Sequence, residues 1–188
     1  MDSAPIGTFA GAWPAVDRPD LVAGPVGAAL AAWRGPEPVE SVLVVDTDPD
    51  AADTAVFCET YGVRPEESAN CVVMAAKRGS TVTLAACVVL ASTRADVNGV
   101  VRRHLGARKA SFAPMDEAVS RSGMAYGGIT PVGLPADWPL LVDAAAAEAP
   151  WLVIGSGLRR SKLLLPGKAL AGLPGAEVLA GLGVPVGG

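Results

Sequence analysis

The sequence predicts an α+β fold in which a mixed, curled β-sheet is surrounded by short helices. Apolar, β-branched runs recur along the chain, and short segments with helix-capping residues separate them without the regular spacing of a βαβ array. Hydrophobic residues make up 51% of the chain and charged residues 18%, which is typical of a globular protein with a large core. The length of 188 residues fits one domain, 1–188, in which residues 1–18 are a loose lead-in rich in Gly, Pro and Ala.

The first half of the chain is expected to form a helix, a strand, a second helix and a hairpin. Asp20 can cap a helix and "RGPEP" would end it, which predicts a helix over 20–33. The run "SVLVVD" (41–46) predicts a strand, and a second helix is expected between Asp50 as its cap and Gly62. Two apolar runs, "ANCVVMAA" and "TVTLAACVVLAS", flank "KRGS", which predicts a β-hairpin.

The second half is expected to alternate short helices and strands. Helices are predicted from Asp96 to about Leu105 and over "MDEAVSRSG", with Gly123 after the second. The short apolar runs "ASFAP", "PLLVD", "WLVIGSG" and "SKLLLPG" predict strands. A terminal helix is expected over 167–172 or over 176–181.

Charge and cysteine content narrow the class of function. The net charge of −4 means that any contact with nucleic acid must come from a local basic patch. The three cysteines form no CxxC pair and the chain has one histidine, so no metal site is expected, because structural zinc needs about four convergent ligands. No secretory leader and no run able to span a bilayer is recognised, which predicts a cytoplasmic protein without membrane contact.

Four further features favour structural roles. The "DTDPDAAD" turn lacks the glycine and glutamate of a calcium loop, so its aspartates are expected to serve as turn and cap residues. "VIGSGLRR" lacks the third glycine of a dinucleotide fingerprint; it is either a strand ending in a turn or a place where small residues let another backbone or a ligand approach. His104 has no orienting partner nearby in the sequence, and the cysteines are not expected to be catalytic.

The segment "YGGITPVGLP" (126–135) is the main candidate for a functional loop. It holds three glycines and two prolines and no charged residue. Glycine leaves backbone N–H groups uncovered by side chains, and proline resists collapse of the loop, so the segment suits holding a ligand by its backbone amides. A tight corner of a barrel would also need these glycines, and the residues alone leave both alternatives open.

Several segments together resemble one known family. "GMAYGGITPVGLP" resembles the GG-I-[ST]-P-x-G loop of the YbaK/prolyl-tRNA synthetase-associated (aminoacyl-tRNA editing) domain family. The order of the other segments also agrees with that family. Before the loop stand the hairpin strand at "ANCVVM" and the helix end "HLGARKASFA", and after it stand the closing segments "PLLVD" and "VIGSGLRRSKLLL". The resemblance covers roughly residues 40–180 and implies a compact, barrel-like mixed sheet with helices around it.

The family resemblance also implies a reaction and a site. Known members hydrolyse the ester that joins a wrong amino acid to the 3′ end of a tRNA, so this chain is expected to be a freestanding aminoacyl-tRNA deacylase without a cofactor. Asn70, Gly127 and Gly128 are the expected catalytic positions: the backbone N–H groups of the glycines would hold the reacting carbonyl, and Asn70 would orient the substrate. Gly128 should need a positive φ or a bare Cα facing the ligand, so that Gly128→Ala would disturb the pocket more than the fold. The expected substrate-binding residues are Tyr126, Ile129, Thr130, Pro131, Gly155, Ser156 and Gly157.

Two positions depart from the family pattern. Well-studied members carry a lysine at the start of the strand where this chain has Asn70, and many have an aspartate where this chain has Lys162. A catalytically silent binding module of the same fold, which takes tRNA, a nucleotide or a protein partner, is therefore the alternative function.

The tRNA acceptor end is the expected partner, with an aminoacyl-tRNA synthetase as a further candidate. The alternative for Arg102 and Arg103 is a structural one, since cations in the last turn of a helix favour its negative dipole end. The residues expected to contact tRNA are the dense basic groups Arg102, Arg103, Arg108 and Lys109, with Arg159 and Arg160.

Overall fold

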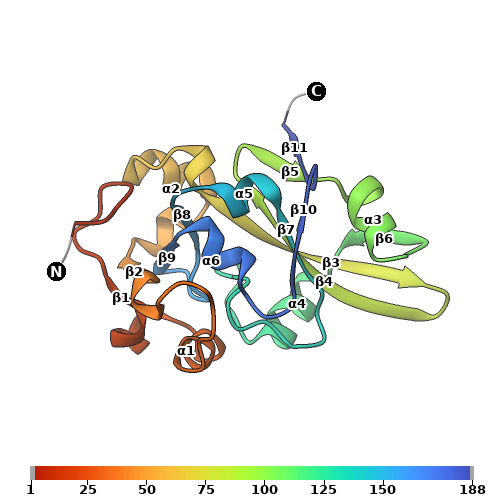
Figure 1. The fold of residues 1–188 in the computed structure, drawn as a ribbon, viewed down its shortest axis with the longest axis horizontal. Coiled ribbons are helices and arrows are strands. Elements are labelled where there is room, and N and C mark those ends of the chain that lie inside the picture. Colours follow the sequence, from red (N-terminus) through yellow and green to blue (C-terminus); the bar gives the residue numbers. More distant parts are fainter. Residues whose placement is uncertain (1–2, 187–188) are drawn as a thin grey trace.

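The computed structural model describes residues 3–186, and it shows a mixed α+β fold (Figure 1). The helices are α1 (Gly24–Ala31), α2 (Thr54–Tyr61), α3 (Arg102–His104), α4 (Met115–Ser122), α5 (Ala144–Glu148) and α6 (Gly167–Ala171). The strands are β1 (Trp13–Pro14), β2 (Leu43–Asp46), β3 (Ala69–Arg78), β4 (Thr81–Leu90), β5 (Thr93–Ala95), β6 (Lys109–Phe112), β7 (Leu140–Asp143), β8 (Leu152–Gly155), β9 (Ser161–Leu165), β10 (Ala176–Leu179) and β11 (Gly183–Pro185). Within the described residues, no helix is both long and apolar enough to cross a bilayer.

The largest sheet has five strands in the order β10-β7-β4-β3-β6. Its centre is the long antiparallel hairpin of β3 and β4, in register from Ala69 opposite Leu90 to Arg78 opposite Thr81. This confirms the hairpin predicted from the two apolar runs around "KRGS". Strand β6 pairs with the far half of β3, and β7 and β10 add in parallel on the other side.

A second sheet has four strands in the order β1-β2-β9-β8, and β5 and β11 form a separate pair. An isolated bridge between Ser68 and Val153 joins the two larger sheets at the start of β3. The edge strands of each sheet do not pair with one another, so the sheets stay open and the expected barrel-like closure is not confirmed.

The main core fills the space between the two larger sheets. Fully buried leucines, valines and alanines of β2, β4, β7, β8 and β9 meet there, and α1, α5 and α6 cover them (Figure 1). A second cluster around Met74, Cys87 and Leu141 lies on the other face of the five-stranded sheet. Each fully buried Leu or Val side chain stabilises the fold by roughly 1.5–3 kcal/mol, so this packing fixes the strands that carry the site.

Several element boundaries differ from those predicted. The first helix begins at Gly24, with Pro25 in its first turn, and not at Asp20, because residues 19–21 form a 3₁₀ turn. The segment after Asp96 begins as a π-helical turn over Val97–Val101, capped by the Asp96 carboxylate at 3.0 Å from the N–H of Gly99 and of Val100. Residues 176–179 form β10, so the terminal helix is α6.

The N-terminal segment and the aspartate-rich turn also show what their residues do. Trp13 and Pro14, within the segment expected to be a loose lead-in, pair with β2, and Ala12 and Ala15 are buried. Asp53, and not Asp50, caps α2, by accepting the N–H of Ala55 at 3.1 Å.

Candidate active site

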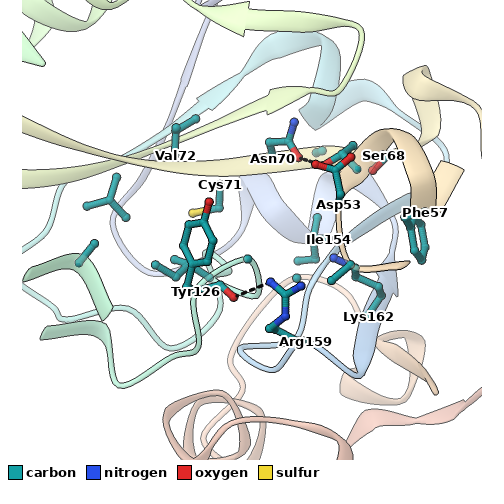
Figure 2. A pocket seen from close by; sticks show the side chains of 18 of the residues that line it. Asp53, Phe57, Ser68, Asn70, Cys71, Val72, Tyr126, Ile154, Arg159 and Lys162 are labelled. Atoms are coloured by element: carbon teal, nitrogen blue, oxygen red, sulfur yellow. Dashed lines mark hydrogen bonds between the residues drawn. The ribbon is translucent and has the colours of Figure 1, made fainter. Parts of the chain in front are cut away.

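A cleft of about 660 Å³ opens where the start of β3 faces the turn between β8 and β9. Helix α2 forms one wall, and the start of α4 and the loop after it form the other. Figure 2 shows Asn70 and Cys71 on β3 on one side of the cleft, with Tyr126, Arg159 and Lys162 on the opposite side. The expected site residues that line it are Asn70, Tyr126, Gly127, Ile129, Gly155 and Arg159.

Close contact between two backbones places the 126–130 loop at this cleft. The Ala125 N–H donates to Gly157 O at 2.8 Å, and the Gly157 N–H donates to Gly128 O at 2.7 Å. A Cβ on Gly155 would lie well inside van der Waals contact of the Gly128 carbonyl oxygen, and a Cβ on Gly128 would lie 2.6 Å from Leu158 O. The small residues of "VIGSG" therefore let another backbone approach closely, which is one of the alternatives left open by the sequence.

Gly128 does not have the geometry expected of it. It is absent from the positive-φ glycines, and its Cα faces the Leu158 backbone and not the cleft. Its N–H is already donated to Ala125 O at 2.9 Å. Gly127 is the residue of the pair that lines the cleft: its φ is +77°, and within the described residues its N–H donates no hydrogen bond.

Lys162 is the most unusual side chain of the cleft. It lies on β9 between fully buried residues, and only 8% of it is exposed. Within residues 3–186 its ammonium group has no hydrogen-bond acceptor and no carboxylate within ion-pair distance; Nζ lies 5.3 Å from the centre of the Phe57 ring. Burial, and then the positive charge of Arg159, lower the pKa of Lys162. Because an unpaired buried charge is costly, such a residue in a cleft indicates a functional site.

Asn70 lies at the edge of the cleft beside α2. Its Oδ1 accepts a hydrogen bond from Thr54 Oγ1 at 2.9 Å, which fixes the side chain and leaves the amide N–H₂ to donate elsewhere. In Figure 2 Asn70 lies next to Asp53, and the neighbouring Cys71 points to the other side of the strand, toward Tyr126. Figure 2 thus shows the Asn70 amide directed away from Tyr126, Arg159 and Lys162, so Asn70 borders the cleft and its role in orienting a substrate stays a prediction.

Arg159 closes one end of the cleft. Its guanidinium donates to Tyr126 O at 3.4 Å and to Pro49 O at 3.3 Å, and so it bridges the loop after α4 and the turn before α2. Arg160 does not line the cleft: it forms an ion pair with Asp46 at 3.3 Å. Arg159 and Lys162 together make this end of the cleft positively charged, and Figure 2 shows their side chains next to one another.

The other expected substrate-binding residues lie outside the cleft. Thr130 is fully buried and its hydroxyl has no partner within the described residues. Ser156 is also fully buried, and its hydroxyl is 2.8 Å from that of Ser161. Pro131 and Gly157 are buried and support the loop and the turn from behind.

The predicted tRNA-contacting cations of 102–109 lie away from the cleft, at the far end of the hairpin. The Arg108 N–H donates to Lys77 O at 2.9 Å, and Lys109 pairs with Lys77 across the strands. His104 has a partner that is distant in the sequence: its Nε2 lies 2.9 Å from the carboxylate of Glu177 on β10. We call the following exposed cations the basic end; none of them forms an ion pair within the described residues: Lys77, Arg78, Arg102, Arg103, Arg108 and Lys109.

Burial keeps the side chains of all three cysteines in the protonated thiol form. Burial raises the pKa of the Cys87 thiol to about 12, and burial raises the pKa of Cys71 still further with a contribution from Cys87. Burial also raises the pKa of Cys58. At neutral pH these groups are thiols and not thiolates, which makes them poor nucleophiles.

Sequence reasoning missed part of the site. Lysine is almost never buried without a partner, so the single charged residue in "SKLLL" was a signal that this strand carries a functional group. Phe57, Thr54 and Phe112 gave no local signal, because ordinary core, cap and strand roles explain them equally well.

Comparison with known proteins agrees with this architecture. A model of the aminoacyl-tRNA editing domain matches residues 48–173, which is more than half of the chain. No functionally curated protein matches the sequence.

Solved structures with the same fold differ widely in sequence. A candidate trans-editing enzyme for prolyl-tRNA synthetase is 22% identical, with a TM-score of 0.69 over 83% of this chain and 93% of its own. A scaffold protein for epitope backbone grafting by computational design is 21% identical, with a TM-score of 0.70 over 84% of this chain and 95% of its own. A candidate signal-transduction protein from Marinobacter aquaeolei VT8 is 17% identical, with a TM-score of 0.54 over 85% of this chain and 30% of its own. At these identities the likeness shows the fold alone, and the family follows from the match over 48–173: the chain belongs to the aminoacyl-tRNA editing domain family.

Proposed function

We propose that this protein is an aminoacyl-tRNA deacylase, which hydrolyses the ester between a wrong amino acid and the terminal ribose of a tRNA. The observation that carries this proposal is Lys162, whose side chain is largely buried and whose ammonium group, which has no hydrogen-bond or ion-pair partner within the described residues, lines a cleft of about 660 Å³. The cleft has room for an amino acid and the adenosine to which it is esterified. Its positive end suits an ester oxygen that gains negative charge during the reaction.

The chain's own groups supply electrostatics and orientation. Water attacks the ester carbon, a new C–O bond forms, and the carbonyl oxygen becomes an oxyanion. Lys162 Nζ and the free N–H of Gly127 stabilise that charge. The C–O bond to the ribose then breaks, and the ribose oxygen takes the proton that the attacking water has lost, passed on by the neighbouring ribose hydroxyl. The products are the free amino acid and the uncharged tRNA.

Asn70 and Lys162 change the charges of the family pattern at one cleft: the position of a lysine is neutral here, and the position of an aspartate carries a cation. The resemblance placed a lysine where this chain has Asn70 and an aspartate where it has Lys162. Both residues line the same cleft, so the cation is retained but comes from β9 in place of β3. Asn70 is held by Thr54 at the edge of the cleft, and its N–H₂ group is directed away from Lys162, so it does not share the oxyanion site with that lysine.

A panel of tRNAs, each charged with one wrong amino acid, tests the proposal. The purified protein should release at least one amino acid well above the spontaneous rate, and the preferred one identifies the substrate. A pocket distinguishes amino acids that differ by one methylene by only about 1–3 kcal/mol, so several similar residues should react with graded rates. Retention of charged tRNA without release would instead support the silent binding module.

We expect the basic end to supply much of the affinity for tRNA. Replacing Arg102 and Arg103 by glutamine should weaken binding and flatten the dependence of log K on log salt by about 0.7–0.9 for each lost phosphate contact. As a control, Arg34→Gln with Arg64→Gln removes the same charge elsewhere and should leave the slope unchanged. Equal slopes for the two double variants would exclude this part of the basic end from the interface.

A further inference from the structure

Three large apolar side chains at the rim of the cleft are exposed to solvent. Phe112 is 65% exposed, Tyr126 57% and Met115 52%. They come from three separate elements, β6, the loop after α4 and the first turn of α4, and all three line the cleft. Every other large hydrophobic side chain that is exposed within the described residues is a valine. The two aromatic side chains that are more than half exposed within the described residues therefore both lie at the rim of the cleft.

The two aromatic rings come from different parts of the rim of the cleft. In Figure 2 the Tyr126 ring rises from the loop toward β3, and its hydroxyl has no partner within the described residues. Phe112 lies at the end of β6 and lines both this cleft and a neighbouring hollow of about 540 Å³, which also contains Arg94, Asn98 and Ser111, and the carboxylate of Asp96, which caps the π-helical turn. Phe112 is thus a ridge between a positively charged cleft and a hollow with further polar donors.

Strand β6 connects this ridge to the basic end. Lys109 begins the strand that Phe112 ends, and three residues of strand span about 10 Å. Arg94 and Lys109 are both exposed, and neither forms an ion pair within the described part of the chain. The cleft and the surface beside it therefore present the cations Arg159 and Lys162, two exposed aromatic rings, and the further cations Arg94 and Lys109.

We propose that Tyr126 and Phe112 are stacking platforms for the unpaired bases at the 3′ end of the tRNA; this inference rests on the proposed function. Single-stranded nucleic acid is bound by aromatic faces on which bases stack, together with cations that follow the phosphates. Tyr126, inside the cleft, takes the terminal base, and Phe112 takes a preceding base. Arg94 and Lys109 then lie on the side from which the phosphates enter. The protein in this way selects an ester attached to an unpaired RNA end over a small ester.

Two measurements test the proposal. The first is the affinity for a fluorescently labelled, uncharged RNA hexamer ending in CCA, compared with the same hexamer carrying abasic sites at its last three positions. Each stacked base contributes about 1–3 kcal/mol, so Phe112→Ala and Tyr126→Ala should each weaken binding of the normal hexamer about 5- to 150-fold. Phe112→Trp should retain binding, because it keeps an aromatic face. The control Val178→Ala removes an exposed apolar side chain from β10 at the opposite edge of the sheet and should have no effect.

The second measurement compares hydrolysis of a mischarged tRNA and of the matching aminoacyl-adenosine. Phe112→Ala should raise KM for the tRNA more than for aminoacyl-adenosine, since the latter lacks the preceding base. Equal losses on both substrates, or equal affinity of wild type for the normal and abasic hexamers, would overturn the stacking proposal and indicate that the rim contacts the amino acid or a protein. The hexamer assay needs no hydrolysis. If the deacylase proposal is wrong, the wild-type protein will release no amino acid from mischarged tRNA. The stacking proposal is tested separately, by whether binding of the hexamer depends on its bases.

Discussion

Replacing Lys162 by methionine should slow ester hydrolysis strongly and at the same time make the protein more stable. Removal of one donor that stabilises an oxyanion lowers kcat by about 10²–10³-fold in hydrolytic enzymes, and we expect a loss of that size here. Methionine keeps an unbranched side chain and removes a charge that lies unpaired beside Phe57. If the unfavourable burial is worth about 1 kcal/mol, the Tm rises by about 2–4 °C. Gain of stability with loss of function is the signature of a functional residue at a strained site.

The pH dependence of stability provides an independent check on Lys162. Because its pKa is lowered in the folded protein, the folded state releases this proton at lower pH than the unfolded chain does. The unfolded state binds more protons between the lowered pKa and the ordinary lysine value of about 10.4, so the free energy of unfolding should rise with pH in that window. Urea denaturation across this range should show the rise in wild type and a smaller one in Lys162→Met. Lys168→Met, at an exposed lysine paired with Glu37, is the matched control and should leave both hydrolysis and this rise intact. A lower Tm together with unchanged hydrolysis in Lys162→Met would contradict the assigned role.

Gly155→Ala should produce the largest loss of stability among conservative substitutions near the site. Its added methyl group would collide with the carbonyl oxygens of Gly128 and Ile129, both of which are backbone atoms that cannot rotate away. Overpacking usually costs about 1–3 kcal/mol, and we expect the upper end of that range, or a Tm lower by about 6–12 °C. The displaced loop should also break the hydrogen bond between the Gly157 N–H and Gly128 O.

Gly24→Ala is the matched control for this substitution. Gly24 lies at the start of α1, where an added Cβ would meet no atom within 4 Å, and its φ is not positive. Alanine there should leave the Tm unchanged or raise it slightly, because it restricts the unfolded chain. Thermal denaturation of both variants distinguishes the cases, and a Gly155→Ala protein as stable as Gly24→Ala would show that the loop and the turn are not tightly packed.

Local patterns in the sequence were sufficient to predict the strands that consist of continuous apolar runs. The apolar runs on both sides of "KRGS" fixed the hairpin, and "SKLLL" and "WLVIGSG" appear as β9 and β8. Short elements were harder, because Pro25 shortened the first helix and the Asp96 cap gave a π-helical turn, both decided by a few backbone contacts. The open sheets could not be predicted at all, since closure depends on which edge strands meet in space.

The site could be predicted only where its residues are unusual for their local position. The glycine-rich loop was recognisable, but which glycine faces the cleft depends on the contact of Gly128 with Leu158, thirty residues later. Pairs such as Thr54 with Asn70 and His104 with Glu177 leave no trace in either local sequence. Lys162 was visible as a departure from the family pattern, and its meaning emerged only when β9 placed it opposite Asn70 in one cleft.

The most direct test is a crystal structure with an adenosine whose 3′ position carries an amino acid through an amide, which the protein cannot hydrolyse quickly. The amide carbonyl oxygen should lie within hydrogen-bond distance of Lys162 Nζ, about 2.7–3.2 Å, with the Gly127 N–H directed at the same oxygen and the adenine against Tyr126. Binding outside the cleft, or a carbonyl oxygen directed away from Lys162, would contradict the claim that this lysine stabilises the reacting ester.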